Sequence, residues 1–188
     1  MEIFKEFITK LLLVIIPVVI GTGVFGYLNY LRTRRDTIRH KSVEFLDEVS
    51  IIINKPLSML FGSIRAQKPK LDDELDQAIS DVFMKRLSVR VKSEAYLHDP
   101  SFWEFYFELS RELSYMKILF SEIEDGNLDQ IANEAQSHCT SFAQKFNVEI
   151  VSDGEGLATP YDDLLKWNST LWVLTIKRLT QAVQGAIK

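Results

Sequence analysis

Residues 11–31 read LLLVIIPVVIGTGVFGYLNYL and contain no charged side chain. Lys10 precedes this stretch, and three arginines within residues 32–35 follow it. Thirteen of its residues are Leu, Ile, Val or Phe, which favour insertion into a bilayer. At about 1.5 Å per residue, a helix of this length reaches about 31 Å, the thickness of a bilayer's hydrocarbon core. The stretch therefore predicts a single N-terminal transmembrane helix, and the rest of the domain organisation follows from it.

Positive charge is unequal on the two sides of the predicted span. Lys5 and Lys10 precede it, whereas five Lys or Arg residues follow it within residues 32–41. The more basic flank of a span stays in the cytoplasm. We therefore expect a single-pass membrane protein of a bacterial inner membrane, with the N-terminus outside and residues 42–188 in the cytoplasm. Residues 1–41 would form the anchor and its juxtamembrane basic segment.

A cleaved signal peptide is the alternative interpretation of the same residues. Residues 11–20 would be its apolar segment, and Gly21, Thr22 and Gly23 would supply a small-residue cleavage site. The apolar run continues to Leu31, however, which is longer than a signal peptide needs. The chain also has one cysteine, Cys139, so it forms no internal disulfide, as suits a reducing compartment. The sequence therefore favours a retained anchor.

Charge divides sharply along the chain. Residues 1–41 hold seven Lys or Arg and three Asp or Glu, a balance of +4, and the whole chain carries −4. Subtraction leaves −8 for residues 42–188. An acidic region of this kind is repelled by nucleic-acid phosphates. General nucleic-acid binding is therefore disfavoured, and the bilayer itself is the first expected partner.

Apolar residues recur at helical spacing through most of residues 42–188. The predicted fold class is all-α: the transmembrane helix followed by a cytoplasmic bundle of about four to five helices. The sequence leaves two assignments open. Residues 148–150 could form a short strand, and residues 85–92 could form either a strand or a continuation of the preceding helix. The pattern predicts helices over residues 42–56, 56–66, 71–83, 100–124, 127–146 and 160–179.

Helix-capping residues mark several of these boundaries. Asp99 precedes Pro100, a typical arrangement of an N-cap and a proline in the first turn. Asn127 is expected to cap the next helix, and Thr159 with Asp162 the last one. The helix that begins at Pro100 is apolar over most of its circumference. Its expected solvent-facing strip consists of Glu104, Glu108, Arg111 and Glu112.

Residues that could carry enzymatic chemistry are few. The sequence contains no phosphate-binding loop, no GxSxG, no HExxH and no paired CxxC. His138 and Cys139 are adjacent, and neighbouring helical residues point about 100° apart, so they do not share a metal readily. Paired acids lie at predicted helix ends, where capping explains them. We therefore expect no catalytic residue, no metal site, no cofactor and no enzymatic activity.

A basic stretch at residues 85–92 contrasts with the acidity around it and is the best candidate for a ligand-binding site. Its cations are Lys85, Arg86, Arg90 and Lys92. Arg86 and Arg90 share one face in a helix and in a strand alike. Two guanidinium groups on one face suit a phosphate or a carboxylate. The alternative is that these cations form salt bridges with the domain's surplus acids.

Two functions of different classes fit these observations. The first is a membrane-anchored, non-enzymatic protein whose acidic helical domain mediates protein interaction and self-association, as a homo-oligomer. The aromatic residues of 102–120, with Trp167 and Trp172, motivate it, because one small domain has difficulty covering so much apolar surface.

The second function is a ligand-gated oligomeric membrane effector. An anionic small molecule, such as a nucleotide messenger, would bind at Arg86 and Arg90 and act on the span through residues 42–53. This arrangement of a membrane tether and a sensing domain resembles, in architecture only, the membrane-tethered effectors of bacterial antiviral defence. The resemblance implies ligand activation and perturbation of the membrane.

Overall fold

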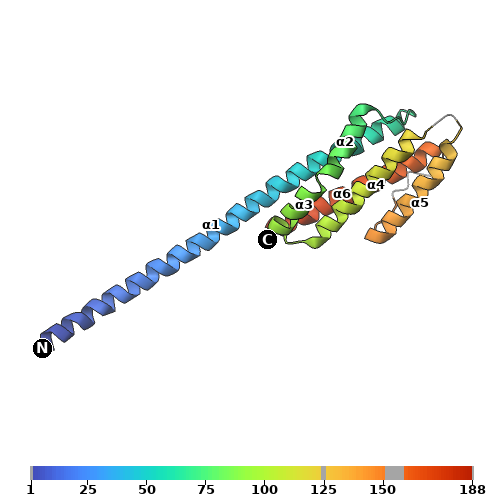
Figure 1. The fold of residues 1–188 in the computed structure, drawn as a ribbon. Helices are drawn as coiled ribbons and strands as arrows, with labels where there is room; N and C mark the ends of the chain where they lie inside the picture. The colour runs from blue at the N-terminus through green and yellow to red at the C-terminus, as the bar shows by residue number, and fades with distance from the viewer. Residues whose placement is uncertain (1, 124–125, 151–158, 188) are drawn as a thin grey trace. The chain divides into compact units, whose positions relative to one another are not determined.

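The computed structural model describes the backbone of residues 2–123, 126–150 and 159–187, and the side chains of residues 26–123, 126–150 and 159–186. Within these ranges it is all-helical and contains no strand, which confirms the all-α part of the predicted fold class. Figure 1 shows the order of the helices. They are α1 (Glu2–Arg65), α2 (Asp73–Met84), α3 (Arg86–Lys92), the π-helical turn η1 (Ser93–Leu97), α4 (Pro100–Ser121), α5 (Leu128–Phe146) and α6 (Pro160–Ile187).

The chain divides into two compact units, residues 1–41 and residues 42–188. Helix α1 contributes to both, and all the other helices belong to the second unit. No helix in the part of the chain with described side chains is both long and apolar enough to cross a bilayer. Of the predicted span 11–31, residues 11–25 lie outside the residues whose side chains are described.

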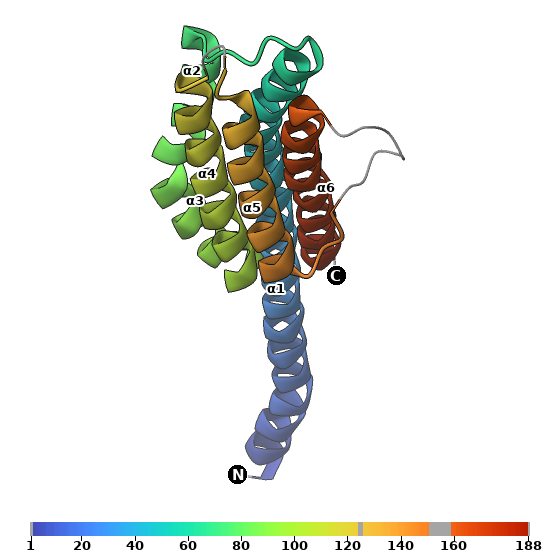
Figure 2. The ribbon, with the colours of Figure 1, turned by 90° about the vertical axis from the view of Figure 1, so that its right-hand side faces the viewer.

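In the second unit, α4, α5, α6 and residues 42–65 of α1 run alongside one another, and α2 and α3 lie along α4 (Figure 2). Their shared core excludes water almost completely. Helix α1 supplies a stripe at helical spacing, and α4 and α6 supply the bulky rings. The main members are Leu46, Val49, Ile53, Leu57, Leu60, Ile64, Phe102, Phe105, Tyr106, Leu109, Leu113, Met116, Leu164, Trp167, Leu171 and Leu174.

Helix α1 does not break at Pro56, so the prediction of a separate short helix over residues 56–66 is wrong. The helix continues to Arg65. Proline removes one backbone donor from a helix interior. Ile53, Leu57 and Leu60 on either side are completely buried, and the packing of this stripe outweighs the lost hydrogen bond.

Residues 85–92 form helix, not strand, and residues 148–150 form no strand either. Helices α2 and α3 are separated only by Lys85, which itself has right-handed helical dihedral angles. The alternation of apolar and polar residues over 87–91, which is typical of a strand, therefore does not prevent these residues from forming a helix. Val89 alone of its three apolar members is buried.

Most of the predicted caps are confirmed. Asp99 accepts a hydrogen bond from the Ser101 amide at 2.9 Å. Asp162 accepts one from the Thr159 amide at 2.8 Å. Asn127 lies at the expected N-cap position, but its side chain donates to the Glu122 carbonyl at 2.6 Å instead of capping α5.

Candidate functional site

Two lysines of the basic stretch 85–92 turn toward α1. Lys92 Nζ donates to Glu48 Oε2 at 2.5 Å, and Lys85 Nζ lies 3.6 Å from Glu48 Oε1. The hydrogen bond from Lys92 is the main cause that lowers the pKa of the Glu48 carboxyl below its usual value. These two predicted ligand-binding residues therefore connect α3 to α1 through one shared carboxylate.

The two predicted arginines lie on α3 in different environments. Arg90 Nε donates to Glu94 Oε1 at 3.2 Å in an exposed pair, a kind worth less than about 1 kcal/mol. Arg86 Nε donates to Ser110 Oγ on α4 at 2.6 Å. The Arg86 guanidinium carbon lies 4.0 Å from the centre of the Phe83 ring and 4.8 Å from that of the Phe107 ring. The structure thus fixes Arg86 far more firmly than Arg90.

A second feature of this region is an exposed apolar stripe, here called the outer apolar face, made of Phe83, Met84, Leu87 and Val91. Met84 is 78% exposed and Leu87 is 73% exposed. Residues 84, 87 and 91 follow helical spacing, so they share one side of the chain. This spacing was present in the sequence, but the alternation of residues 87–91 obscured it.

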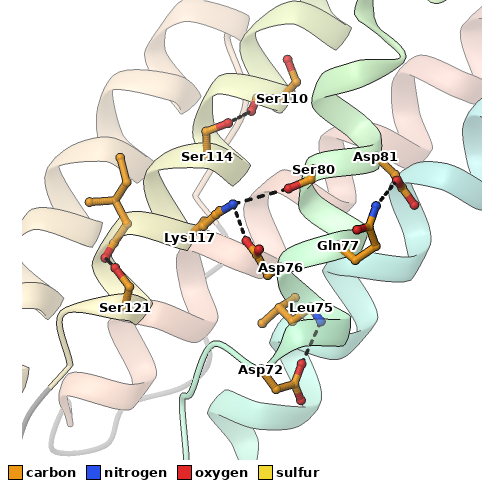
Figure 3. Close-up of polar contacts among 11 residues, drawn as sticks. Asp72, Leu75, Asp76, Gln77, Ser80, Asp81, Ser110, Ser114, Lys117 and Ser121 are labelled. Atoms are coloured by element: carbon orange, nitrogen blue, oxygen red, sulfur yellow. Dashed lines mark hydrogen bonds and ion pairs between the residues drawn. The ribbon is translucent and has the colours of Figure 1, made fainter.

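The outer apolar face continues into a groove between α2 and α4. The groove has a volume of about 350 Å³, and its lining includes Ile79, Phe83, Met84 and Ile118. At its side, Lys117 of α4 reaches Asp76 and Ser80 of α2 (Figure 3). This polar contact links α2 to α4 beside the groove.

A similar groove, with a volume of about 360 Å³, lies between α1 and α6. Val43 and Leu46 line one side, and Leu179 and Val183 line the other. Neither groove contains a cluster of charged side chains. Both surfaces suit an apolar partner better than a charged small molecule.

The strip on α4 that was expected to face solvent is partly buried, and this expectation is wrong for two of its members. Glu108 is 6% exposed and Glu112 is 3% exposed, because α5 and α6 cover this side of α4. Lys145 Nζ of α5 lies 2.7 Å from Glu108 Oε1, and Arg111 Nη2 lies 3.0 Å from Glu108 Oε2. His138 Nδ1 of α5 lies 3.4 Å from Glu112 Oε2.

Within the described ranges, no three His, Cys, Asp or Glu side chains come together to hold a metal ion. The Cys139 thiol is buried with its Sγ 3.6 Å from Thr170 Oγ1, and burial raises its pKa. A thiol of this kind is a poor nucleophile.

Comparison with known proteins adds no assignment, since no protein-family model, curated protein or solved structure matches the chain.

Proposed function

We propose that the chain is a single-pass membrane protein whose acidic helical domain mediates protein interaction and, in particular, associates with a second copy of itself. The first half of the proposal rests on the uncharged stretch of residues 11–31 and its basic C-terminal flank. The second half rests on the outer apolar face. The domain has no enzymatic role in this proposal.

The area of the outer apolar face supports self-association. Together with Ile118, its side chains expose on the order of 500 Å² of apolar surface, as large as the main patch of a typical soluble monomer. Two copies would bury about 1,000 Å², which reaches the lower limit for a specific interface. Tethering both copies in one bilayer raises their effective concentration, so an interface of this modest size suffices.

Self-association is tested by crosslinking the full chain in membranes and by measuring its mass in mild detergent. A double substitution, Met84→Asp with Leu87→Asp, places two charges on the outer apolar face, and we expect a monomer. Ile51→Asp is the control, because Ile51 is an apolar residue on α1 that is also largely exposed, at 65%. Wild-type protein that is monomeric in both measurements contradicts the proposal.

The membrane anchor is tested separately. We expect the full chain to remain in the membrane pellet after alkaline extraction and residues 42–188 to resist external protease in intact cells. Deletion of residues 11–31 should release the protein. If the mature chain instead begins near residue 24 and is found in a soluble fraction, the signal-peptide interpretation holds.

A second candidate function is the ligand-gated membrane effector, and the environment of Arg86 favours it. Within the described ranges, Arg86 lies in no ion pair with a carboxylate, whereas Lys85, Arg90 and Lys92 each do. Two aromatic rings and Ser110 hold its guanidinium in place. A fixed guanidinium with free donors is suited to a phosphate or carboxylate.

Thermal unfolding of the full chain against a panel of cyclic nucleotides tests this candidate, because a bound ligand raises the melting temperature. We expect Arg86→Ala to abolish any shift and Arg90→Ala to reduce it. Lys166→Ala, which removes an ion-paired cation on α6, is the control. The absence of a shift with every nucleotide would count against this candidate and would leave self-association untouched.

A further inference from the structure

Helix α4 places two carboxyl groups one turn apart on the side that α5 and α6 cover. The side chains of Glu108 and Glu112 are 7% and 4% exposed. Carboxylates are rarely buried this completely unless they are paired. The two residues therefore allow a direct comparison between a buried acid that has permanent cations beside it and one that has none in an ion pair.

Glu108 forms ion pairs with two permanent cations, and Glu112 forms none within the described ranges. Glu108 lies in ion pairs with Arg111 and Lys145, one cation on each of its oxygens. Glu112 Oε2 is completely buried and forms no hydrogen bond with any described group. Its nearest ionisable partner is His138, at 3.4 Å from Nδ1, which is charged only when it is protonated.

The imidazole ring is fixed in this position by aromatic neighbours. The centre of the His138 ring lies 4.4 Å from that of Tyr115 on α4 and 5.4 Å from that of Trp167 on α6. His138 is therefore packed against α4 and α6 on one side, while its side chain is 31% exposed on the other. The charge state of the pair is thus coupled to the packing of α4, α5 and α6.

Other charged groups around the pair come from all three helices, and none supplies a dedicated counter-charge. Burial is the largest influence: it raises the pKa of Glu112 to about 7 and lowers the pKa of His138. Arg111 and, more weakly, the indole of Trp167 favour the carboxylate form of Glu112, and Glu108 opposes it. The ionisable groups nearby are Glu108, Arg111 and Tyr115 on α4, Glu134, Cys139 and Lys145 on α5, and Asp163 and Lys166 on α6.

Helix α5 is the element that this pair can affect most. Its buried face consists largely of small side chains, with Ala132, Ala135, Cys139 and Ala143 among its six buried residues. Helix α5 packs far more extensively against α6 than against α4. Polar contacts therefore make up a large part of the small contact between α5 and α4.

We propose that Glu112 and His138 form a proton-responsive contact which loosens the docking of α5 against α4 and α6 as the pH rises through neutrality. With one proton on the pair, either the neutral acid faces the neutral imidazole or the carboxylate faces the imidazolium. Loss of that proton leaves a buried carboxylate beside an uncharged ring. The cost of this state is relieved when α5 opens and water reaches Glu112.

The direction of the response follows from linkage. Since the folded-state pKa of Glu112 lies above its unfolded value, its stabilising effect is complete at low pH and is lost as the pH rises to about 7. The lowered pKa of His138 acts in the opposite sense, because its stabilising effect is lost as the pH falls below its usual value. Glu112 has the larger shift and decides the sign.

Native-state hydrogen exchange of the full chain in mild detergent tests the proposal. Exchange rates of α5 peptides at pH 6 and pH 8 are divided by the intrinsic rates at each pH. We expect the opening of α5 to rise on the order of threefold in the wild-type protein. His138→Asn removes the opposing group, and the rise should approach tenfold.

Glu112→Gln imitates the protonated acid and should abolish the rise. Glu104→Gln makes the same chemical change at an exposed position of α4 and should behave like the wild-type protein. A Glu112→Gln variant that keeps the wild-type rise would overturn the proposal, as would a wild-type protein without any rise. The proposal does not depend on self-association, because the pair lies away from the outer apolar face and the monomeric Met84→Asp, Leu87→Asp variant should retain the rise.

Discussion

Two charged regions of the helical domain, the basic stretch of α3 and the acidic strip of α4, behave in opposite ways. The cations of α3 are conspicuous in the sequence, but three of the four lie in ion pairs at the surface. The carboxyl groups of α4 resemble an ordinary solvent-facing strip, but Glu108 and Glu112 are buried. The charges of α4 have the larger effect on stability, because α5 and α6 exclude water from Glu108 and Glu112 and no helix does so for the cations of α3 that lie in surface ion pairs.

The largest expected effect tests the buried acid of α4. Glu112→Gln should stabilise the full chain by about 3 kcal/mol at pH 8 and by less than about 1 kcal/mol at pH 5. The reason is that glutamine removes the cost of a buried negative charge, which exists only above the unfolded-state pKa. Urea unfolding at both pH values measures the difference. A gain of equal size at both pH values would show that charge is not the cause.

A smaller effect is expected at the ion-paired acid, Glu108. Lys145→Met leaves Glu108 with Arg111 alone and should destabilise the protein by about 1–2 kcal/mol. The loss is smaller than for a fully buried ion pair because Lys145 is half-exposed. Lys177→Met, at an exposed position of α6, is the control and should change stability by less than about 0.5 kcal/mol. Equal effects of the two substitutions, measured by urea unfolding, would mean that the Glu108 pair contributes nothing.

The smallest changes in stability are expected in α3, where substitutions of Arg86 and Arg90 compare a guanidinium packed on two rings with one in an exposed ion pair. Arg86→Lys removes the planar group between Phe83 and Phe107 and should cost about 1 kcal/mol. Arg90→Lys should cost less than about 0.5 kcal/mol, and high salt should abolish that cost. Thermal unfolding of both variants at low and high salt gives the comparison. A larger cost at Arg90 would contradict the environments described for these two residues.

The helical elements were largely predictable because their signals are local. The buried stripe of α1 repeats every three or four residues, and Asp99 and Asp162 cap helices through groups within three positions. Pro56 was misjudged because its local cost is visible in the sequence and the compensating packing is not. Asn127 was misjudged for a related reason, since its side chain bonds to a carbonyl five residues earlier instead of capping α5.

The candidate sites were less predictable, because each depends on residues far apart in the chain. Arg86 is distinguished from Arg90 by Ser110 and Phe107, more than 20 positions away. The outer apolar face required the choice between helix and strand at residues 85–92, which the local pattern left open. The Glu112–His138 pair could not be anticipated, since an acid on an amphipathic helix usually faces water.

The sequence by itself determined the helical class, the helix boundaries capped by Asp99 and Asp162, and the division of charge between residues 1–41 and 42–188. The helical class follows from the spacing of apolar residues, the capped boundaries from side chains that bond to nearby backbone groups, and the charge division from the number of charged residues in each part. Only the tertiary structure decided which charges are exposed, which are paired and which are buried. The exposure of each charge depends on which helices cover its face. The pKa of a carboxyl group in turn depends on that burial and on the charges and hydrogen-bond donors around it.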